Sequence, residues 1–212
     1  MIFLRRGELF TGLIETMGTV RSTGSRFQVE SDTDLGLVRG DSLAVNGSCL
    51  TVTGVQKNNL FFDISPETFR RIVVPVPGTR VNLERSMPAE GRFHGHIVTG
   101  HVDEAGVVTK VRRTAGFSEF SISFQQKSSL LLVEKGSVAV AGISLTVVSI
   151  TRREFVVTVI PETLQATTAG EWKPGYRVNL EFDIIGKYVT QAAQAARSSE
   201  SLREYLEQSR RG

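Results

Sequence analysis

Short runs in which apolar and polar residues alternate dominate the chain before residue 184. Examples are segments 27–30, 42–45 and 81–84, which are separated by turns rich in Gly, Asn and Asp. Alternation with a period of two is the pattern of a β-strand that buries one face. Because helical periodicity is scarce here, this part of the chain is predicted to be all-β.

The pattern changes at Ile184 and becomes helical. Apolar residues then recur at helical spacing among Gln, Arg and Glu; they are Tyr188, Ala192, Ala195 or Ala196, Leu202, Tyr205 and Leu206. This spacing predicts a C-terminal α-helix with one apolar stripe. An apolar stripe must pack against another surface. This surface belongs either to a neighbouring subunit or to the preceding domain of the same chain, and the sequence does not distinguish the two.

The first half of the chain is repeated in the second half. FTGLIETMGTV (10–20) returns as VTGHVDEAGVV (98–108), SLAVNGSCLTV (42–52) as SVAVAGISLTV (137–147), PETF (66–69) as PETL (161–164), and PGTRVNLE (77–84) as PGYRVNLE (174–181). Matches in the same order indicate a duplicated domain. The predicted division is an N-terminal extension (1–8), two domains (9–95 and 96–184) and a C-terminal helix (185–212).

Each copy has room for about six short strands. Open sheet edges expose unpaired backbone groups, and closing the sheet removes them. The predicted fold is therefore all-β, with two tandem six-stranded Greek-key β-barrels followed by a C-terminal α-helix.

The composition disfavours several classes of function. Lys and Arg total 25 against 22 Asp and Glu, so a net charge of +3 provides no dense basic surface for nucleic acid. No segment is long and apolar enough for a signal-peptide core or a membrane span. The one cysteine, Cys49, cannot form an intramolecular disulfide. These features predict a cytoplasmic protein with neither nucleic acid nor membrane as a partner.

One polar pattern occurs at matching positions in both copies. Gly47 is followed by Cys49 and Thr51, and Gly142 is followed by Ser144 and Thr146. Residues two apart in a strand share a face, so each pair presents small polar groups beside a glycine that lets a ligand approach. An outward polar face is the alternative, and the repetition beside Pro-Glu-Thr favours a ligand pocket.

These motifs resemble a known family. LFTGLIETMG (9–18), NGSCLTV (46–52), GHIVTGHV (95–102), GISLTV (142–147), IPETL (160–164) and DIIGKYV (183–189) together resemble riboflavin synthases. The resemblance runs from Leu9 to about Val189. Each motif alone is unspecific, but their common order in both halves is highly specific.

The resemblance implies a dismutation of two 6,7-dimethyl-8-ribityllumazine molecules. One gives a four-carbon unit to the other, which yields riboflavin and 5-amino-6-ribitylaminouracil without a cofactor or metal. In the family, the facing pockets come from the N-terminal barrel of one subunit and the C-terminal barrel of its neighbour in a homotrimer. The C-terminal helix would then be the trimer contact. Association with a lumazine synthase shell is a further partner interaction that the resemblance suggests.

Positions where the two copies differ are informative, because donor and acceptor must be treated differently. Such pairs are Cys49 and Ser144, Asn46 and Ala141, Leu13 and His101, and Phe10 and Val98. The family usually carries Asp or Asn at the position of Ala141, so one polar contact to the second lumazine is expected to be missing. The family also usually begins just before Phe10, which is expected to lie beside the active site.

By resemblance, the predicted catalytic residues are Cys49, His101, Ser42 and Ser144. A thiol at Cys49 would add to the electrophilic ring carbon or transfer a proton, and His101 suits acid–base catalysis because histidine titrates near neutral pH. The first pocket is expected to contain Cys49, Ser42, Thr51 and Thr68, and the second Ser144, Thr146, Ile160, Thr163 and Asp183. Phe10, Thr11, Gly12 and Gly100 complete the predicted substrate-binding set.

Several of these residues have simpler alternative roles, and the chain as a whole has alternative functions. A lone cysteine is often a small buried hydrophobe, and Thr68 or Thr163 suits the cap of a helical turn. A metal site at His94-x-His96 with His101 is disfavoured, since no cysteine is near. The closest alternative function is a lumazine or flavin carrier on the same fold. A single-strand-binding barrel would need interleaved basic and aromatic residues, and a reductase would need a following nucleotide domain.

Overall fold

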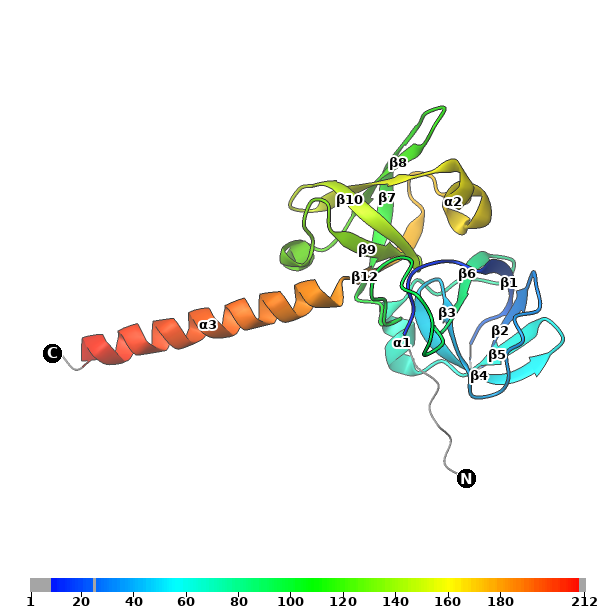
Figure 1. Cartoon of the computed structure of the whole chain (residues 1–212), viewed down its shortest axis with the longest axis horizontal. Helices are drawn as coiled ribbons and strands as arrows, with labels where there is room; N and C mark the ends of the chain where they lie inside the picture. The colour runs from blue at the N-terminus through cyan, green and yellow to red at the C-terminus, as the bar shows by residue number, and fades with distance from the viewer. Residues whose placement is uncertain (1–8, 25, 210–212) are drawn as a thin grey trace, which may run out of the picture.

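The computed structural model describes residues 9–24 and 26–209, with side chains described as far as Arg197. The predicted extension (1–8) lies outside the described residues. Each half of the chain forms its own barrel, and the two barrels lie against each other (Figure 1).

The first barrel contains β1 (Thr16–Ser22), β2 (Phe27–Ser31), β3 (Ser42–Val45), β4 (Ser48–Gln56), β5 (Asn59–Phe62) and β6 (Arg80–Arg85). The second contains β7 (Glu104–Arg113), β8 (Ser118–Ser123), β9 (Ser137–Val140), β10 (Ile143–Ile150), β11 (Glu154–Val159) and β12 (Arg177–Phe182). The orders are β1-β2-β5-β4-β3-β6 and β10-β11-β8-β7-β12-β9, which around a closed ring are the same. The prediction of two tandem six-stranded Greek-key barrels is confirmed.

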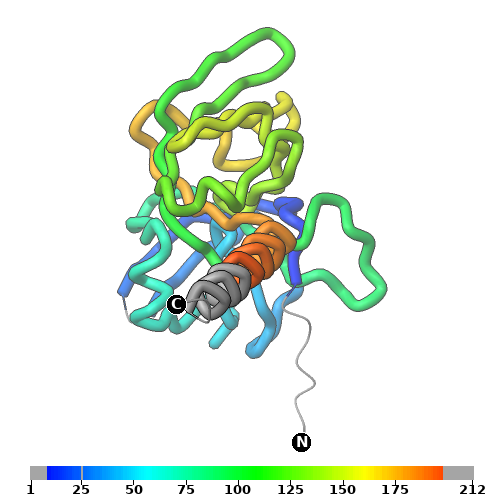
Figure 2. Tube along the Cα trace, turned by 90° about the vertical axis from the view of Figure 1, so that its left-hand side faces the viewer, coloured from blue at the N-terminus to red at the C-terminus, as the bar shows by residue number. Residues whose placement is uncertain are grey.

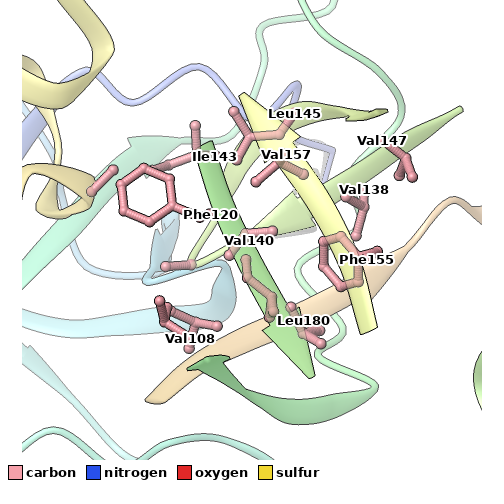
Figure 3. Close-up of a cluster of buried hydrophobic side chains, with 14 of the residues drawn as sticks. Val108, Phe120, Val138, Val140, Ile143, Leu145, Val147, Phe155, Val157 and Leu180 are labelled. Carbon is pink, nitrogen blue, oxygen red and sulfur yellow. The ribbon is translucent and has the colours of Figure 1, made fainter. Parts of the chain in front are cut away.

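Side-chain alternation explains how each barrel fills its interior. Along β8, Phe120 and Ile122 are fully buried while Ser121 between them is half-buried. Figure 3 shows Phe120, Val140, Phe155 and Leu180 converging from different strands. Inward-facing apolar residues of every strand therefore build one core in each barrel.

Two short helices were not predicted as elements. Helices α1 (Pro66–Arg71) and α2 (Pro161–Ala166) follow the fifth strand of each barrel, and both begin with the repeated Pro-Glu-Thr. Proline suits the first helical turn because it needs no amide donor there. Two 3₁₀ turns, η1 (Gln126–Leu131) and η2 (Thr168–Glu171), occur only in the second half among the described residues. These elements are too short to show periodicity in the sequence.

The two barrels meet through equivalent residues. Phe10 and its repeat partner Val98 form an isolated antiparallel bridge, with N···O distances of 2.8 and 3.1 Å. Gly47 and Gly142, also repeat partners, are in contact: a Cβ added to Gly47 would lie 2.7 Å from the amide nitrogen of Gly142. Contact between equivalent positions indicates an approximate twofold relation between the barrels.

Two buried asparagines join the barrels reciprocally. The side-chain amide of Asn82 donates to the carbonyl of Ala141, and that of Asn179 donates to the carbonyl of Asn46, both at 2.9 Å. Their side-chain oxygens accept the amides of Thr168 (2.8 Å) and Val73 (2.6 Å). Each asparagine therefore satisfies backbone groups that would otherwise be buried without partners.

The predicted C-terminal helix is confirmed as α3 (Ile184–Ser209). Near its start, the Thr190 hydroxyl donates to the carbonyl of Leu130 in η1 at 3.2 Å. The helix then runs away from both barrels (Figure 1), and Figure 2 looks along it. Tyr188 and Val189 are 68% and 63% exposed. This part of the apolar stripe is thus left uncovered by its own chain, while the side chains of Leu202, Tyr205 and Leu206 lie outside the described residues. Within the described ranges, no helix is long and apolar enough to cross a membrane.

The twofold relation yields a stability prediction at Ala141. Ala141 has a left-handed φ of +49° and is 3% exposed, beside a cavity of about 200 Å³ between the barrels. Its partner Asn46 has a similar φ of +46° and accepts the amide of Asn82 with its side chain at 2.8 Å. Asparagine tolerates this backbone conformation better than alanine. We expect Ala141→Asn to raise the free energy of unfolding by ~1 kcal/mol.

Urea unfolding of Ala141→Asn tests this expectation. Lys57→Asn is the matched control, because Lys57 has a φ of +54° in an exposed turn, where only the backbone preference changes. If Lys57→Asn is stabilised but Ala141→Asn is not, the hydrogen bond expected by symmetry with Asn46 does not form.

Candidate active site

Two glycine loops cross between the barrels, so that each half of the chain completes the other half's barrel. The carbonyl of Gly12, from the start of the first half, accepts the amide of Ser144 on β10 at 2.8 Å. The carbonyl of Gly100, from the start of the second half, accepts the amide of Cys49 on β4 at 2.9 Å. The two predicted catalytic positions Cys49 and Ser144 therefore have the same backbone environment.

Only glycine fits at these two crossing points. Gly12 and Gly100 have φ of +77° and +76°. A Cβ added to Gly100 would lie 2.4 Å from the Cβ of Cys49, and one added to Gly12 would lie 2.7 Å from the Cβ of Ser144. A side chain at either position would push the loop away from the strand. These glycines thus allow the loops to approach Cys49 and Ser144 closely.

A buried carboxylate binds each crossing loop. Glu84 on β6 accepts the amide (2.8 Å) and hydroxyl (3.2 Å) of Thr11 and the amide of Gly12 (3.1 Å). Glu181 on β12 accepts the amide (2.6 Å) and hydroxyl (2.8 Å) of Thr99 and the amide of Gly100 (2.9 Å). The repeat had aligned these glutamates without indicating what they bind. They were missed because the contacts join residues more than seventy positions apart.

The first pocket brings together four of the predicted site residues. It has a volume of about 300 Å³ and contains Cys49 from β4, Thr68 from α1, and Gly100 and His101 from the crossing loop. The His101 side chain is exposed and lines the pocket. A thiol, a hydroxyl and an imidazole that face one cavity can bind a polar ring and move protons.

Ser42 and Thr51 do not line this pocket. Thr51 is exposed two positions beyond Cys49 on β4, and Ser42 is buried opposite it on β3. The Thr68 amide is capped by the hydroxyl of Ser65 at 3.1 Å, so Ser65 rather than Thr68 is the helix cap.

An ion pair at one side of the first pocket was not predicted. The ammonium of Lys187, in the first turns of α3, lies 2.7 Å from the carboxylate of Asp103, and both residues line the pocket. Asp103 also accepts the amide of Phe182 at 2.8 Å. Lys187 was missed because α3 has no counterpart in the first half of the chain. Charged groups are thus available beside Cys49 and His101.

The corresponding place in the second barrel contains a histidine that the sequence did not assign to it. Nδ1 of His96 lies 2.7 Å from the hydroxyl of Ser144. Burial lowers the pKa of His96, although the nearby Asp183 carboxylate opposes the shift. His96 had been weighed only as a metal ligand. Its Nε2 is buried without a hydrogen-bond partner among the described residues, so one ring nitrogen is left for a further contact.

The other predicted residues of the second barrel lie on β10, at and just before α2, and just before α3. Thr146 is exposed two positions further along β10, Thr163 is half-buried on α2, and Ile160, just before α2, is 54% exposed. Asp183 accepts the amide of Ile185 at 2.9 Å at the start of α3. Among the described residues, no three His, Cys, Asp or Glu side chains lie close enough to hold a metal ion.

Phe10 and Thr11 come directly before Gly12 in the first crossing loop. Phe10 is fully buried with Ala44, Val98 and Ala139, and Cys49 packs against this cluster. Thr11 is 6% exposed and bound to Glu84. Both residues lie next to the predicted catalytic positions, and their predicted contact with substrate stays a prediction.

The environment of Glu84 predicts a pH-dependent stability. Burial raises the pKa of Glu84 from its ordinary 4.5 to about 7, and the hydrogen bonds from Thr11 and Gly12 oppose this shift. The folded protein then retains a proton that the unfolded chain releases between pH 4.5 and 7. The contribution of Glu84 to stability is therefore complete below pH 4.5 and is lost as the pH rises through 7, by up to ~3 kcal/mol.

Glu84→Gln cannot titrate and isolates this contribution. We expect the unfolding free energy of the wild type minus that of the variant to fall between pH 4.5 and 7, as measured by urea unfolding. A difference that is constant over this range would show that the hydrogen bonds balance burial, and one that rises would show that they outweigh it.

Comparison with known proteins agrees with this architecture. The lumazine binding domain matches twice, at residues 11–86 and 99–183. Riboflavin synthase of Bacillus subtilis is 38% identical over 193 residues, covering 85% of this chain and 88% of its own. Riboflavin synthase of Photobacterium phosphoreum is 41% identical over 190 residues, covering 85% and 87%.

A solved structure of LumP complexed with riboflavin superposes with a TM-score of 0.74 at 20% identity, covering 82% of this chain and 98% of that chain. This likeness shows the shared fold. The two domain matches and the level of identity show more: the chain belongs to the riboflavin synthase family.

Proposed function

We propose that this protein catalyses the dismutation of two 6,7-dimethyl-8-ribityllumazine molecules to riboflavin and 5-amino-6-ribitylaminouracil. One molecule gives a four-carbon unit to the other, so no external oxidant or cofactor is needed. The observation that carries the proposal is the pair of related sites, with Cys49 and Ser144 in the same backbone frame.

A reaction between two identical molecules benefits from two similar sites. Similar sites hold both rings in comparable orientations and convert an encounter in solution into a reaction of bound neighbours. Donor and acceptor must nevertheless react differently. Here Cys49 and His101 serve one site, whereas Ser144 and His96 serve the other. The difference lies in side chains on a common frame.

In the first pocket, we assign covalent or proton chemistry to Cys49 and acid–base chemistry to His101. The Cys49 thiol either adds to the electrophilic ring carbon or transfers a proton. Thr68 contributes a hydroxyl, and Lys187 a donor for a ring carbonyl or a ribityl hydroxyl. Ser42, predicted as catalytic, and Thr51, predicted to bind substrate, do not line this pocket, and their roles stay predictions.

In the second barrel, Ser144, Thr146, Ile160 and Thr163 hold the other lumazine, with the Asp183 carboxylate nearby. His96 orients the Ser144 hydroxyl through its Nδ1 contact. The lowered pKa of His96 keeps its ring neutral at neutral pH, so that one nitrogen accepts and the other donates a hydrogen bond.

The working assembly in this proposal is a homotrimer in the cytoplasm. Pockets of neighbouring subunits face each other, and α3 packs against its neighbours. Ile185, Tyr188 and Val189 are all more than half exposed along the start of α3, which is a face that a subunit contact would bury. The division into domains 9–95 and 96–184 with a tail of 185–212 belongs to the same proposal, as does association with a lumazine synthase shell.

Size-exclusion chromatography followed by an assay of each fraction tests activity and assembly together. We expect fractions at three times the chain mass of 23.3 kDa to convert lumazine to riboflavin and 5-amino-6-ribitylaminouracil in equal amounts, followed by absorbance. Tight lumazine binding without product would favour the carrier function instead. Full activity in a monomeric fraction would exclude the trimer as the working form.

Cys49→Ser tests the proposed role of the thiol. A serine hydroxyl keeps the size of the group but is a much weaker nucleophile and acid. We expect turnover to fall about 100-fold or more, with lumazine affinity changed by less than about threefold. Steady-state kinetics and fluorescence titration with lumazine provide the two values. Unchanged turnover would remove Cys49 from the mechanism.

A further inference from the structure

We propose that Glu181 is the positioning residue of His101: from β12 of the second barrel, at the contact between the barrels, its carboxylate fixes the loop that carries His101 into the first pocket. The proposal rests on the role proposed above for His101. Glu84 performs the equivalent task for the loop that lies on Ser144.

The contacts of Glu181 account for the course of the loop. Oε1 accepts the amide of Thr99 at 2.6 Å and its hydroxyl at 2.8 Å, and Oε2 accepts the amide of Gly100 at 2.9 Å. Glu181 is 4% exposed, so water competes little for these bonds. Both carboxylate oxygens are thus used to hold the two residues that directly precede His101.

Gly100 connects this carboxylate to the first pocket. Its amide is bound to Glu181, and its carbonyl accepts the amide of Cys49 at 2.9 Å. Its conformation, at a φ of +76°, turns the chain between these two contacts. The backbone of the residue before His101 is therefore held from both barrels. The position of the imidazole relative to the thiol depends on this double attachment.

The second loop provides an internal comparison. Glu84 binds Thr11 and Gly12 with the same set of donors, and Gly12 accepts the amide of Ser144. The next residue is Leu13 in this loop and His101 in the other. The same carboxylate device thus presents different side chains, which indicates that it sets backbone position and leaves the chemistry to the residue that follows.

Glu181→Gln is the main test, because glutamine keeps the shape but replaces one acceptor oxygen by an NH₂ group that cannot accept a backbone N–H. We expect kcat to fall about tenfold or more with little change in KM for lumazine, since a small displacement of a catalytic group mainly affects the transition state. The imidazole signals of His101, followed by NMR through a pH titration, are expected to move.

Two controls separate positioning from a general loss of stability. Val178→Ala, a buried position on the same strand, is expected to lower the melting temperature without moving the His101 signals or the kcat of the folded protein. Glu84→Gln is expected to leave the His101 signals in place, because it releases the other loop. If Glu181→Gln does not fold, Thr99→Val removes only the hydroxyl bond to Glu181 and is expected to move the same signals by less.

The proposal is overturned if folded Glu181→Gln, or folded Thr99→Val in its place, has the wild-type kcat and wild-type His101 signals. His101→Gln distinguishes this failure from failure of the proposed catalytic role. If His101→Gln is fully active, the role of His101 is wrong, whereas displaced His101 signals in Glu181→Gln would still support positioning.

Discussion

The architecture depends on two carboxylates that are buried at the contact between the barrels. Glu84 and Glu181 are 5% and 4% exposed, and a carboxylate in such a place is stable only when donors surround it. The donors come from Thr11 and Gly12 in one case and from Thr99 and Gly100 in the other. Satisfying these two groups brings the crossing loops onto β4 and β10 and joins the two barrels.

Much of the fold could be predicted because its signals are local or repeated. Alternating runs such as residues 42–45 mark strands wherever they occur, and the same run at 137–140 marks the duplicate. The equivalence of Cys49 and Ser144 also followed from the repeat, since equivalent positions of a duplicated barrel have equivalent neighbours. The tail helix was long enough for its period to be visible, whereas α1 and α2 were not.

The rest of the site depends on contacts between distant positions that carry no local pattern. His96 reaches Ser144 across 48 positions, and it lies in a segment without regular structure. Lys187 reaches the first pocket from a helix that has no duplicate. The repeat placed Thr11 and Thr99 correctly as partners, but it did not indicate that each binds a buried glutamate. Polar residues beside a pocket can serve the scaffold as well as the substrate.

Duplication also explains how one scaffold can treat two identical molecules differently. Strand order, glycine conformation and carboxylate contacts are the same in both halves, so the backbones of the two halves have similar shapes. Discrimination then needs only a few side chains, because 1.4 kcal/mol already corresponds to a tenfold preference. Two such differences are present: Cys49 in the first half corresponds to Ser144 in the second, and Leu13 in the first half corresponds to His101 in the second. Neither difference disturbs the shared backbone. A site of this kind keeps its geometry constant while its chemistry diverges.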